Sequence, residues 1–391
     1  KINEKFYFQA FLITFFLFIS ELFRSKLFGG LPFNLYAHLW IFNEYFIKIV
    51  SFIGVFGLSF LTTLWIVLTV LFIMKQEKKF IITLIFLPII LVSFSMLNEN
   101  KSLNGHETID VRVVQPNIPQ KEKWDRSLFQ KHIDKIIALS SQGGGTKQLV
   151  VIWPEVAMTV FLNEHKNLID YIKKKLDDDT IIITGGLRRV FDGDSFKIFN
   201  SIYVIQKDKV IFYDKKRLVP FGEFIPLRFI LDIIKLTPGD TDFSKGEIEN
   251  SLTIKFENKK IIFEPSICYE AIFQTFNYKK VDLIVNITND AWFGNTTGPK
   301  QHLNASIFRS VEKGVPLIRS ANSGISVITD INGKILKKLE LNKTGFVESK
   351  VTLGNNSTFF MKYKNKVVIY LIFIIFIMHM LADFLIKKRK S

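Results

Sequence analysis

Apolar residues are distributed unevenly along this chain of 391 residues. Two stretches, 52–74 and 80–97, contain no charged residue, and a third, 366–386, contains few titratable groups. Each is long enough to cross a bilayer core of about 30 Å as a helix that rises about 1.5 Å per residue. A shorter apolar run over 6–23 predicts a further spanning helix.

Residues 27–50 are apolar but are broken by glycine, proline and polar side chains. This pattern favours an interfacial or re-entrant segment within a membrane region at 1–104, because irregular backbone at membrane depth must be covered by protein or water. Residues 105–352 have the mixed composition of a globular domain that is large enough for a full core. The sequence therefore predicts one globular domain between membrane helices, with a basic tail at 387–391.

Strand-like and helix-like patterns alternate within the globular domain. The spacing of apolar residues predicts helices over 124–141 and 301–313. Gly185-Gly186 is predicted to end one strand, and Asn332-Gly333 is a strong hairpin signal. Apolar, β-branched runs predict strands over 109–114, 149–153, 181–184, 202–205, 210–213, 283–287, 316–319, 325–329 and 335–339. The pattern is typical of an α/β domain with layered sheets.

Basic clusters indicate the orientation of the membrane segments. One cluster, 75–79, separates two predicted spans, and another, 387–390, follows the last. Both should be cytoplasmic by the positive-inside rule, which places the globular domain outside the cytoplasm, in the periplasm of a Gram-negative cell. The formal net charge is +16. Because the basic residues are scattered and partly flank membrane segments, we expect contact with membrane lipids and no nucleic-acid partner.

The chain contains a single cysteine, Cys268, at the end of an apolar run. It can form no internal disulfide and no cysteine zinc cluster, so it is either a buried apolar side chain or a nucleophile. Two other apolar runs lead to Glu155 and Lys215, and sites in α/β folds gather beyond the carboxyl ends of strands. These residues suit acyl transfer through a thiol, with Glu155 as the base, Lys215 as the oxyanion partner and Cys268 as the nucleophile. A solvated turn for Glu155 and an exposed hairpin end for Lys215 are the alternatives.

The candidate residues lie in longer motifs, Trp153-Pro-Glu155, Leu218-Val-Pro-Phe-Gly-Glu223 and Ile267-Cys-Tyr-Glu270. These motifs resemble those of the nitrilase superfamily and, more narrowly, of its membrane branch, the apolipoprotein N-acyltransferase family. Trp292-Phe-Gly and the following residues to His302, and Arg319 to Gly324, also match. The resemblance covers nearly the whole chain, with the motifs in the family's order.

This resemblance implies a nitrilase-like αββα sandwich inserted between transmembrane helices. It also implies that Glu155 is the general base, Lys215 the catalytic lysine and Cys268 the nucleophile. As supporting or substrate-binding residues, Glu223, Tyr269 and Glu270 match further positions on which the family's activity depends, and Trp124 matches a tryptophan close to the substrate. No metal and no diffusible cofactor is implied.

The activity that the resemblance implies is transfer of a fatty acyl chain from a phospholipid, typically phosphatidylethanolamine, through a thioester on Cys268. The acceptor would be the N-terminal amine of the diacylglyceryl-cysteine of an apolipoprotein. We expect a monomer in the bacterial inner membrane with its catalytic domain on the periplasmic side. Apolar segments around 224–243 and 291–294 are expected to form lipid-facing arms. Family members usually have further helices before the position of Lys1, so such helices are missing here or the chain is naturally reduced.

Two other functions remain open. One is a membrane-tethered amidase that acts on a small amide, because the same three residues hydrolyse amides and nitriles in soluble relatives. The other is a non-catalytic membrane protein that binds lipoproteins. Substitution of Cys268 separates catalysis from binding, and release of lysophospholipid separates acyl transfer from hydrolysis of a small amide.

Overall fold

The computed structural model describes residues 4–98, 107–142, 148–177, 179–207, 209–225, 242–247, 251–276, 280–355 and 357–388. The chain divides into two compact units. The helical unit comprises Lys1–Ser102, Val311–Gly314 and Ser357–Ser391, and the sandwich unit comprises Leu103–Ser310 and Val315–Asn356.

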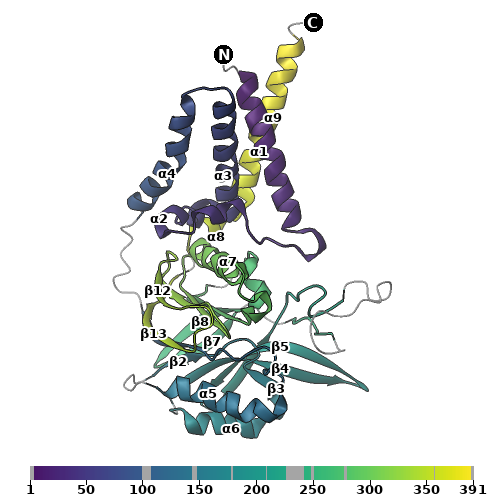
Figure 1. Cartoon of the computed structure of the whole chain (residues 1–391), viewed down its shortest axis with the longest axis vertical. Coiled ribbons are helices and arrows are strands. Elements are labelled where there is room, and N and C mark those ends of the chain that lie inside the picture. The colour runs from purple at the N-terminus through teal and green to yellow at the C-terminus, as the bar shows by residue number, and fades with distance from the viewer. Residues whose placement is uncertain are drawn as a thin grey trace. The chain divides into compact units, whose positions relative to one another are not determined.

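The helical unit is built mainly from four long helices: α1 (Glu4–Arg24), α3 (Val50–Met74), α4 (Lys79–Leu97) and α9 (Lys366–Lys388) (Figure 1). Among the described residues, three helices are long and apolar enough to cross a membrane, and they lie in α1, α3 and α4. The described apolar part of α9 is Val368–Met378. Large apolar side chains of α4, such as Ile82 and Phe86, are exposed, which suits a lipid environment.

Helix α3 is not continuous, although its sequence predicts an uninterrupted span over 52–74. Gly54 has left-handed, non-helical backbone angles (φ 69°, ψ 171°). A Cβ there would lie 2.3 Å from the Phe360 ring, so only glycine fits. The backbone N–H of the next residue, Val55, donates to Glu312 Oε1 at 2.7 Å, which replaces the helical hydrogen bond lost at the break.

Residues 27–50 form short pieces instead of a span: the 3₁₀ helices η1 (Leu27–Gly29) and η2 (Tyr36–Trp40), and α2 (Glu44–Ile47). Side chains of the helical unit satisfy part of this irregular backbone. Glu21 accepts from the Tyr36 N–H at 2.9 Å, and Arg24 donates to the carbonyl of Leu31 at 3.2 Å. The broken sequence pattern is therefore confirmed, and its place at a membrane interface stays a prediction.

The described residues of the sandwich unit form two sheets. The seven strands of the first have the order β13-β1-β2-β4-β5-β6, with β3 paired to β4; their bounds are β1 Thr108–Gln115, β2 Val150–Ile152, β3 Met158–Phe161, β4 Ile181–Asp192, β5 Ser195–Gln206, β6 Lys209–Asp214 and β13 Gly345–Thr352. The six strands of the second have the order β12-β11-β10-β9-β8-β7; their bounds are β7 Leu252–Phe256, β8 Lys259–Ile267, β9 Leu283–Thr288, β10 Leu317–Ala321, β11 Ser326–Thr329 and β12 Ile335–Leu339. Parallel strands form the middle of each sheet, β1-β2-β4 in the first and β8-β9-β10 in the second.

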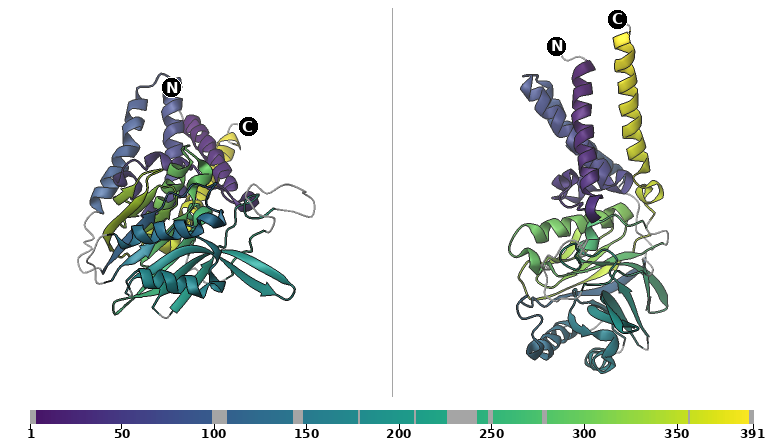
Figure 2. Two further views of the ribbon diagram at one scale, coloured as in Figure 1. Left: turned by 60° about the horizontal axis from the view of Figure 1, so that its bottom comes forward. Right: turned by 90° about the vertical axis from the view of Figure 1, so that its right-hand side faces the viewer.

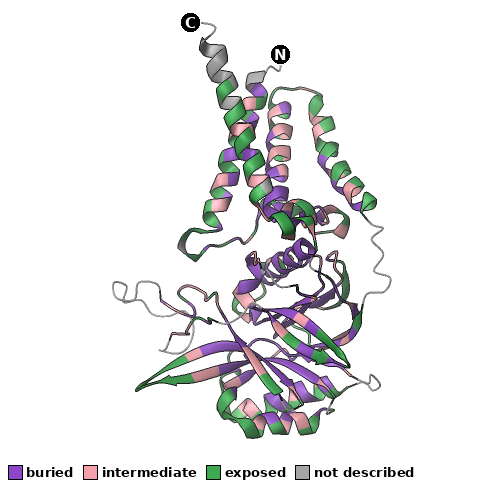
Figure 3. Cartoon of the chain, turned by 180° about the vertical axis from the view of Figure 1, so that it is seen from behind, coloured by how far each residue is buried: buried purple, intermediate pink, exposed green. Residues whose placement is uncertain are grey.

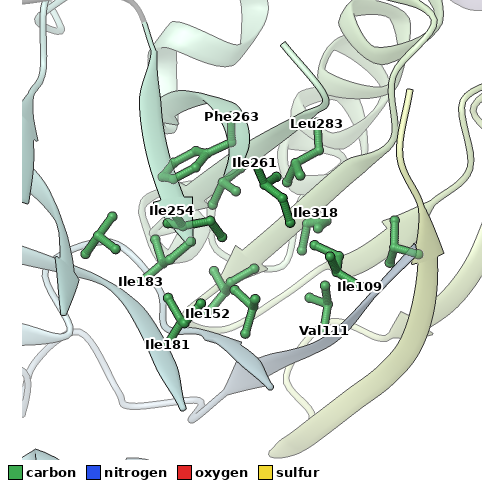
Figure 4. Packing of buried hydrophobic residues seen from close by; sticks show 14 of the residues in the cluster. Ile109, Val111, Ile152, Ile181, Ile183, Ile254, Ile261, Phe263, Leu283 and Ile318 are labelled. Carbon is green, nitrogen blue, oxygen red and sulfur yellow. The ribbon is translucent and has the colours of Figure 1, made fainter. Parts of the chain in front are cut away.

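The facing sides of the sheets enclose one hydrophobic core (Figure 4). Ile152 and Ile183 of the first sheet point toward Ile254 and Phe263 of the second. Helices α5 (Phe129–Ser141) and α6 (Lys166–Lys175) cover the other face of the first sheet, where a second core forms (Figures 1 and 2). Helix α7 (Gly298–Lys313) covers the second sheet. The predicted αββα sandwich is therefore confirmed.

One predicted strand end is wrong, because β4 continues through Gly185 and Gly186 to Asp192. Its distal part pairs with β5 in a long hairpin whose far end is exposed (Figure 3). Glycine is required at position 185 for a different reason, which is the close approach of a neighbouring turn. A Cβ at Gly185 would lie 2.4 Å from the Val156 nitrogen and 2.7 Å from the Glu155 Cα. Gly185 therefore makes room for the turn that carries Glu155.

Candidate active site

Three side chains that the sequence singled out lie just beyond the ends of strands in the sandwich unit. Glu155 follows β2, Lys215 follows β6, and Cys268 follows β8. The first two residues come from the first sheet, and the cysteine comes from the second. The structure brings them together: the Glu155 carboxylate and the Lys215 ammonium both act on the pKa of Cys268. These positions fit the rule that α/β sites lie outside the carboxyl ends of strands.

Cys268 is half-buried and has a left-handed backbone, with φ of 48°. It is the first residue of the 3₁₀ helix η5 (Cys268–Ile272), directly after β8. A left-handed conformation is unfavourable for a non-glycine residue and persists only where its surroundings fix it. Sharp strand-to-helix turns of this kind expose the nucleophile in other hydrolase folds.

Glu155, Lys215 and Glu223 form a buried group that we call the base cluster. The Lys215 Nζ lies 2.8 Å from Glu223 Oε1 and 3.5 Å from Glu155 Oε1. Glu155 also accepts hydrogen bonds from the Asn200 side chain and from the backbone N–H of Asn289, each at 2.8 Å. The lysine is thus paired more closely with Glu223, while the Glu155 carboxylate is held by neutral donors.

The Cys268 thiol and the Lys215 ammonium both hold their protons more tightly than usual. Burial raises the pKa of the Cys268 thiol to about 12; Glu155 adds to this effect and Lys215 opposes it. Burial alone would lower the pKa of Lys215, but Glu223 and Glu155 more than offset it and hold that pKa above its usual range. At neutral pH the cysteine is therefore a thiol that needs a base, and the lysine is a fixed cation.

A second buried group, the elbow cluster, consists of Asp290, His302 and Arg319. His302 Nε2 donates to the Cys268 carbonyl at 2.9 Å, and its Nδ1 lies 2.8 Å from Asp290 Oδ1. Arg319 pairs with the other oxygen of Asp290 at 2.6 Å. Burial would raise the pKa of Asp290, but Arg319 and His302 outweigh it and lower that pKa to about 2. This cluster holds the main chain of the nucleophile, a role that the sequence motifs containing these residues did not reveal.

Glu270 joins the nucleophile turn to the segment that carries Lys215. Its Oε1 accepts from the Tyr213 hydroxyl at 2.9 Å and from the backbone N–H of Lys216 at 2.7 Å, and its Oε2 accepts from the Ile267 N–H at 2.9 Å. Burial raises the pKa of Glu270, and the backbone donors oppose the rise. Neighbouring Tyr269 is half-buried, and its ring packs edge-on against Phe273.

The remaining predicted site residues are positioned differently. Glu223 is buried, and its Oε2 accepts from the Val219 N–H at 2.8 Å. The Trp124 side chain is 43% exposed, so it is available to a substrate. Sequence reasoning missed its neighbour Lys123, which is buried and donates from Nζ to the Glu155 carbonyl at 2.9 Å. A lysine in a loop gives no sequence signal of burial.

Cys268, Asp290 and His302 could be considered as a metal site, since their donor atoms lie within 4.8 Å of one another. However, the imidazole of His302 already contacts a carbonyl and a carboxylate, and the cation of Arg319 pairs with Asp290. A metal ion would have to displace these bonds beside a positive charge. We therefore identify no metal ligands in this group.

The predicted lipid-facing arms are described only in part. Residues 226–241, most of the first arm, lie outside the described residues. In the second arm, the side chains of Trp292 and Phe293 are 50% and 37% exposed. Exposed aromatic rings suit a membrane interface, and the arms stay a prediction.

Comparisons with known proteins identify the family of this chain. Residues 110–356 match the family model described as carbon–nitrogen hydrolase. An apolipoprotein N-acyltransferase of Rickettsia prowazekii (strain Madrid E) is 36% identical over 398 residues, which cover 97% of this chain and 77% of that protein. One of Rhizobium rhizogenes (strain K84 / ATCC BAA-868) is 39% identical over 256 residues, 61% of this chain and 47% of that protein. A solved CN-hydrolase superfamily protein from Xanthomonas campestris is 14% identical, with a TM-score of 0.43, and the match covers 63% of this chain and 91% of that one.

Proposed function

Because this chain belongs to the apolipoprotein N-acyltransferase family, within the carbon–nitrogen hydrolases, we propose that it N-acylates lipoproteins through a thioester on Cys268. The acyl donor is a phospholipid of the phosphatidylethanolamine type, and the acceptor is the N-terminal amine of a diacylglyceryl-cysteine. One observation carries the proposal: a carboxylate that can take the thiol proton and a fixed ammonium flank the only cysteine of the chain.

The first half-reaction forms the thioester. Glu155 accepts the proton of the Cys268 thiol as the sulfur attacks the sn-1 ester carbonyl carbon. The carbon–sulfur bond forms, and the carbonyl oxygen becomes an oxyanion. When the intermediate collapses, the ester carbon–oxygen bond breaks, and Glu155 returns the proton to the leaving alcohol of the lysophospholipid. A general base is needed because the raised pKa of Cys268 keeps it a thiol at neutral pH.

Lys215 and the backbone N–H of Tyr269 stabilise the oxyanion. Lys215 suits this role because its Nζ is fixed 2.8 Å from Glu223 and stays charged throughout the reaction. A preorganised cation in a buried site stabilises developing negative charge far better than water does. Glu223 therefore acts by holding the lysine in place.

The second half-reaction transfers the acyl chain to the amine. The neutral amine attacks the thioester carbonyl carbon, and a carbon–nitrogen bond forms. Glu155 takes a proton from the attacking nitrogen, the carbon–sulfur bond breaks, and the proton passes to the departing Cys268 thiolate. The thiol and the carboxylate are restored, so the cycle consumes no cofactor.

The apolar helices support a location of the reaction at a membrane. We infer a monomer that spans the bacterial inner membrane several times, with the sandwich unit on the periplasmic side. Both substrates are lipid-anchored, so attachment to the membrane supplies them at high local concentration. It also limits the access of water, which would otherwise hydrolyse the thioester.

The test uses the full chain in vesicles that contain phosphatidylethanolamine with a labelled sn-1 acyl chain. We expect the label to move to a synthetic diacylglyceryl-cysteine peptide with equimolar release of lysophospholipid. Cys268→Ser should abolish both products. Hydrolysis of a small soluble amide without lysophospholipid release would instead identify the amidase that the carbon–nitrogen hydrolase match leaves possible.

A further inference from the structure

The buried charges of the base cluster do not balance by themselves. Glu155 and Glu223 carry two negative charges, and Lys215 carries one positive charge. A buried excess charge is unfavourable, because the low-dielectric interior solvates a charge much less well than water does. The excess grows further when Cys268 loses its proton to solvent, because the thiolate then lies near a Glu155 that is still ionised. A second cation close to Glu155 would remove it.

Lys123 is placed to supply that cation. Its side chain is only 5% exposed, and its Nζ donates to the backbone carbonyl of Glu155 at 2.9 Å. Among the described residues, no carboxylate forms a salt bridge with it. Its charge instead acts on the Glu155 carboxylate and on Cys268. A buried ammonium whose hydrogen-bond acceptor is neutral is unusual unless its charge serves nearby groups.

Lys123 also supports the turn that carries the base. The carbonyl that it binds belongs to Glu155, and the next residue, Val156, has a left-handed backbone with φ of 46°. The same turn is bonded to strand β4, where the Gly185 N–H donates to the Pro154 carbonyl at 3.2 Å. Two hydrogen bonds thus hold the turn, one from the lysine and one from strand β4.

We propose that Lys123 is a positioning residue that fixes the Glu155 turn and supplies a positive charge that offsets the excess negative charge around Glu155 and favours ionisation of the Cys268 thiol. The proposal rests on the proposed function for its purpose, since only a reacting cysteine needs such a charge. Its effect on the thiolate is independent of any lipid substrate. An experiment on the thiolate can therefore contradict the role of Lys123 without contradicting acyl transfer, and the reverse also holds.

The charge of Lys123 depends on pH in a way that provides a signature. Burial lowers the pKa of Lys123 to about 8, and the charges of Glu155 and Cys268 partly offset the fall. The cation is therefore present at pH 7 and is lost above about pH 8. The other charged groups near this site are Lys215, Glu223 and Asp290. Glu122, the residue before Lys123, has its Oε2 3.9 Å from the Nε2 of His132.

The experiment measures alkylation of Cys268 by iodoacetamide in the full chain, without phospholipid, from pH 7 to pH 9.5. Cys268 is the only thiol, so the reaction reports one site. Lys123→Met removes the charge, and Lys123→Arg keeps it at every pH. Lys121→Met is the matched control, because Lys121 lies two residues away and is exposed.

We expect Lys123→Met to react about tenfold more slowly than the unsubstituted chain at pH 7, which corresponds to about one pKa unit of the thiol. The difference should shrink toward unity above pH 9, where Lys123 itself is neutral. Lys123→Arg should match the unsubstituted chain at pH 7 and exceed it above pH 8; this comparison suffices if the Met variant does not fold. A rate ratio that is constant across pH, or an equal effect of Lys121→Met, would overturn the proposal.

Discussion

The two sheets of the sandwich unit contribute two different kinds of polar cluster to Cys268. The elbow cluster comes from the second sheet and α7, and its Asp290 lies 2.6 Å from Arg319 and 2.8 Å from His302. The base cluster comes from the first sheet, and its Lys215 is 2.8 Å from Glu223 but 3.5 Å from Glu155. In the first cluster both oxygens of the carboxylate are closely paired, and His302 contacts the main chain of the cysteine. The second leaves one carboxylate loosely paired beside the thiol.

This difference separates positioning from chemistry. A closely paired cluster holds the strained turn at φ of 48° but has no free basic site. A loosely paired carboxylate can accept a proton, because its partner charge belongs mainly to another group. Placing the two functions on separate sheets allows each to be rigid in its own way. Substitutions on the two sides should therefore have effects of different size and kind.

The largest effect is expected from Glu155→Gln. The amide keeps the size of the side chain but cannot accept the thiol proton, so acyl transfer should fall by about 10³-fold. Single-turnover release of lysophospholipid measures this step directly. Glu164→Gln, at an exposed carboxylate paired with Arg189, is the matched control and should change the rate little. A Glu155→Gln chain that retains its rate would remove Glu155 as the base.

A smaller loss, about 10²-fold, is expected from Gly185→Ala. The added Cβ would meet backbone atoms of Val156 and Glu155 at 2.4 and 2.7 Å, so the turn of the base must shift. Gly186→Ala is the matched control, because its Cβ would meet its neighbours at 3.4 to 3.5 Å, an ordinary contact. Equal rates for the two variants would show that the position of the Glu155 turn does not limit the reaction.

Asp290→Asn should lower acyl transfer by only about tenfold, since the elbow cluster touches the main chain and not the reacting atoms. Its clearer effect concerns acid stability. The pKa of Asp290 is depressed to about 2 in the folded protein, from 3.8, by Arg319 and His302 after the opposing effect of burial. The carboxylate therefore stabilises the fold above about pH 4, and this contribution is lost as pH falls through 2.

The acid effect is measured by unfolding the chain in detergent between pH 5 and pH 2, with tryptophan fluorescence as the readout. The unsubstituted chain should lose stability over this interval, while Asp290→Asn should start less stable and show a flatter dependence. An unchanged slope would show that the elbow cluster contributes nothing to stability through this charge.

Much of the architecture was predictable from the sequence, because buried strands and amphipathic helices have strong periodicities. The strands near Cys268 and Glu155 were located correctly, and the helix over 301–313 is confirmed as the body of α7. The end of β4 was not, since a glycine required for close approach to a distant turn looks the same as a strand terminator. The distal part of β4, residues 187–192, also lacks the apolar alternation that reveals a strand.

The site was predictable only where a motif or a strand end marked it. Glu155, Lys215 and Cys268 each follow the end of a strand. Their roles stay predictions that the geometry supports. Their supporting groups come from elsewhere: Arg319 lies within a strand, and Lys123 lies in a loop before α5. Burial and pairing of such residues depend on tertiary contacts, which single-sequence patterns do not encode.

The most direct test of the central role of Cys268 is intact-mass analysis of the full chain incubated with phosphatidylethanolamine and no acceptor. We expect a mass increase of one acyl chain that maps to the peptide containing Cys268, is removed by hydroxylamine, and disappears when the lipopeptide acceptor is added. The Cys268→Ser variant should not form an adduct with these properties: none that hydroxylamine removes, and none that transfers its acyl chain to the acceptor. Acyl transfer without any adduct on the chain, or an equally competent adduct in Cys268→Ser, would contradict this role of Cys268.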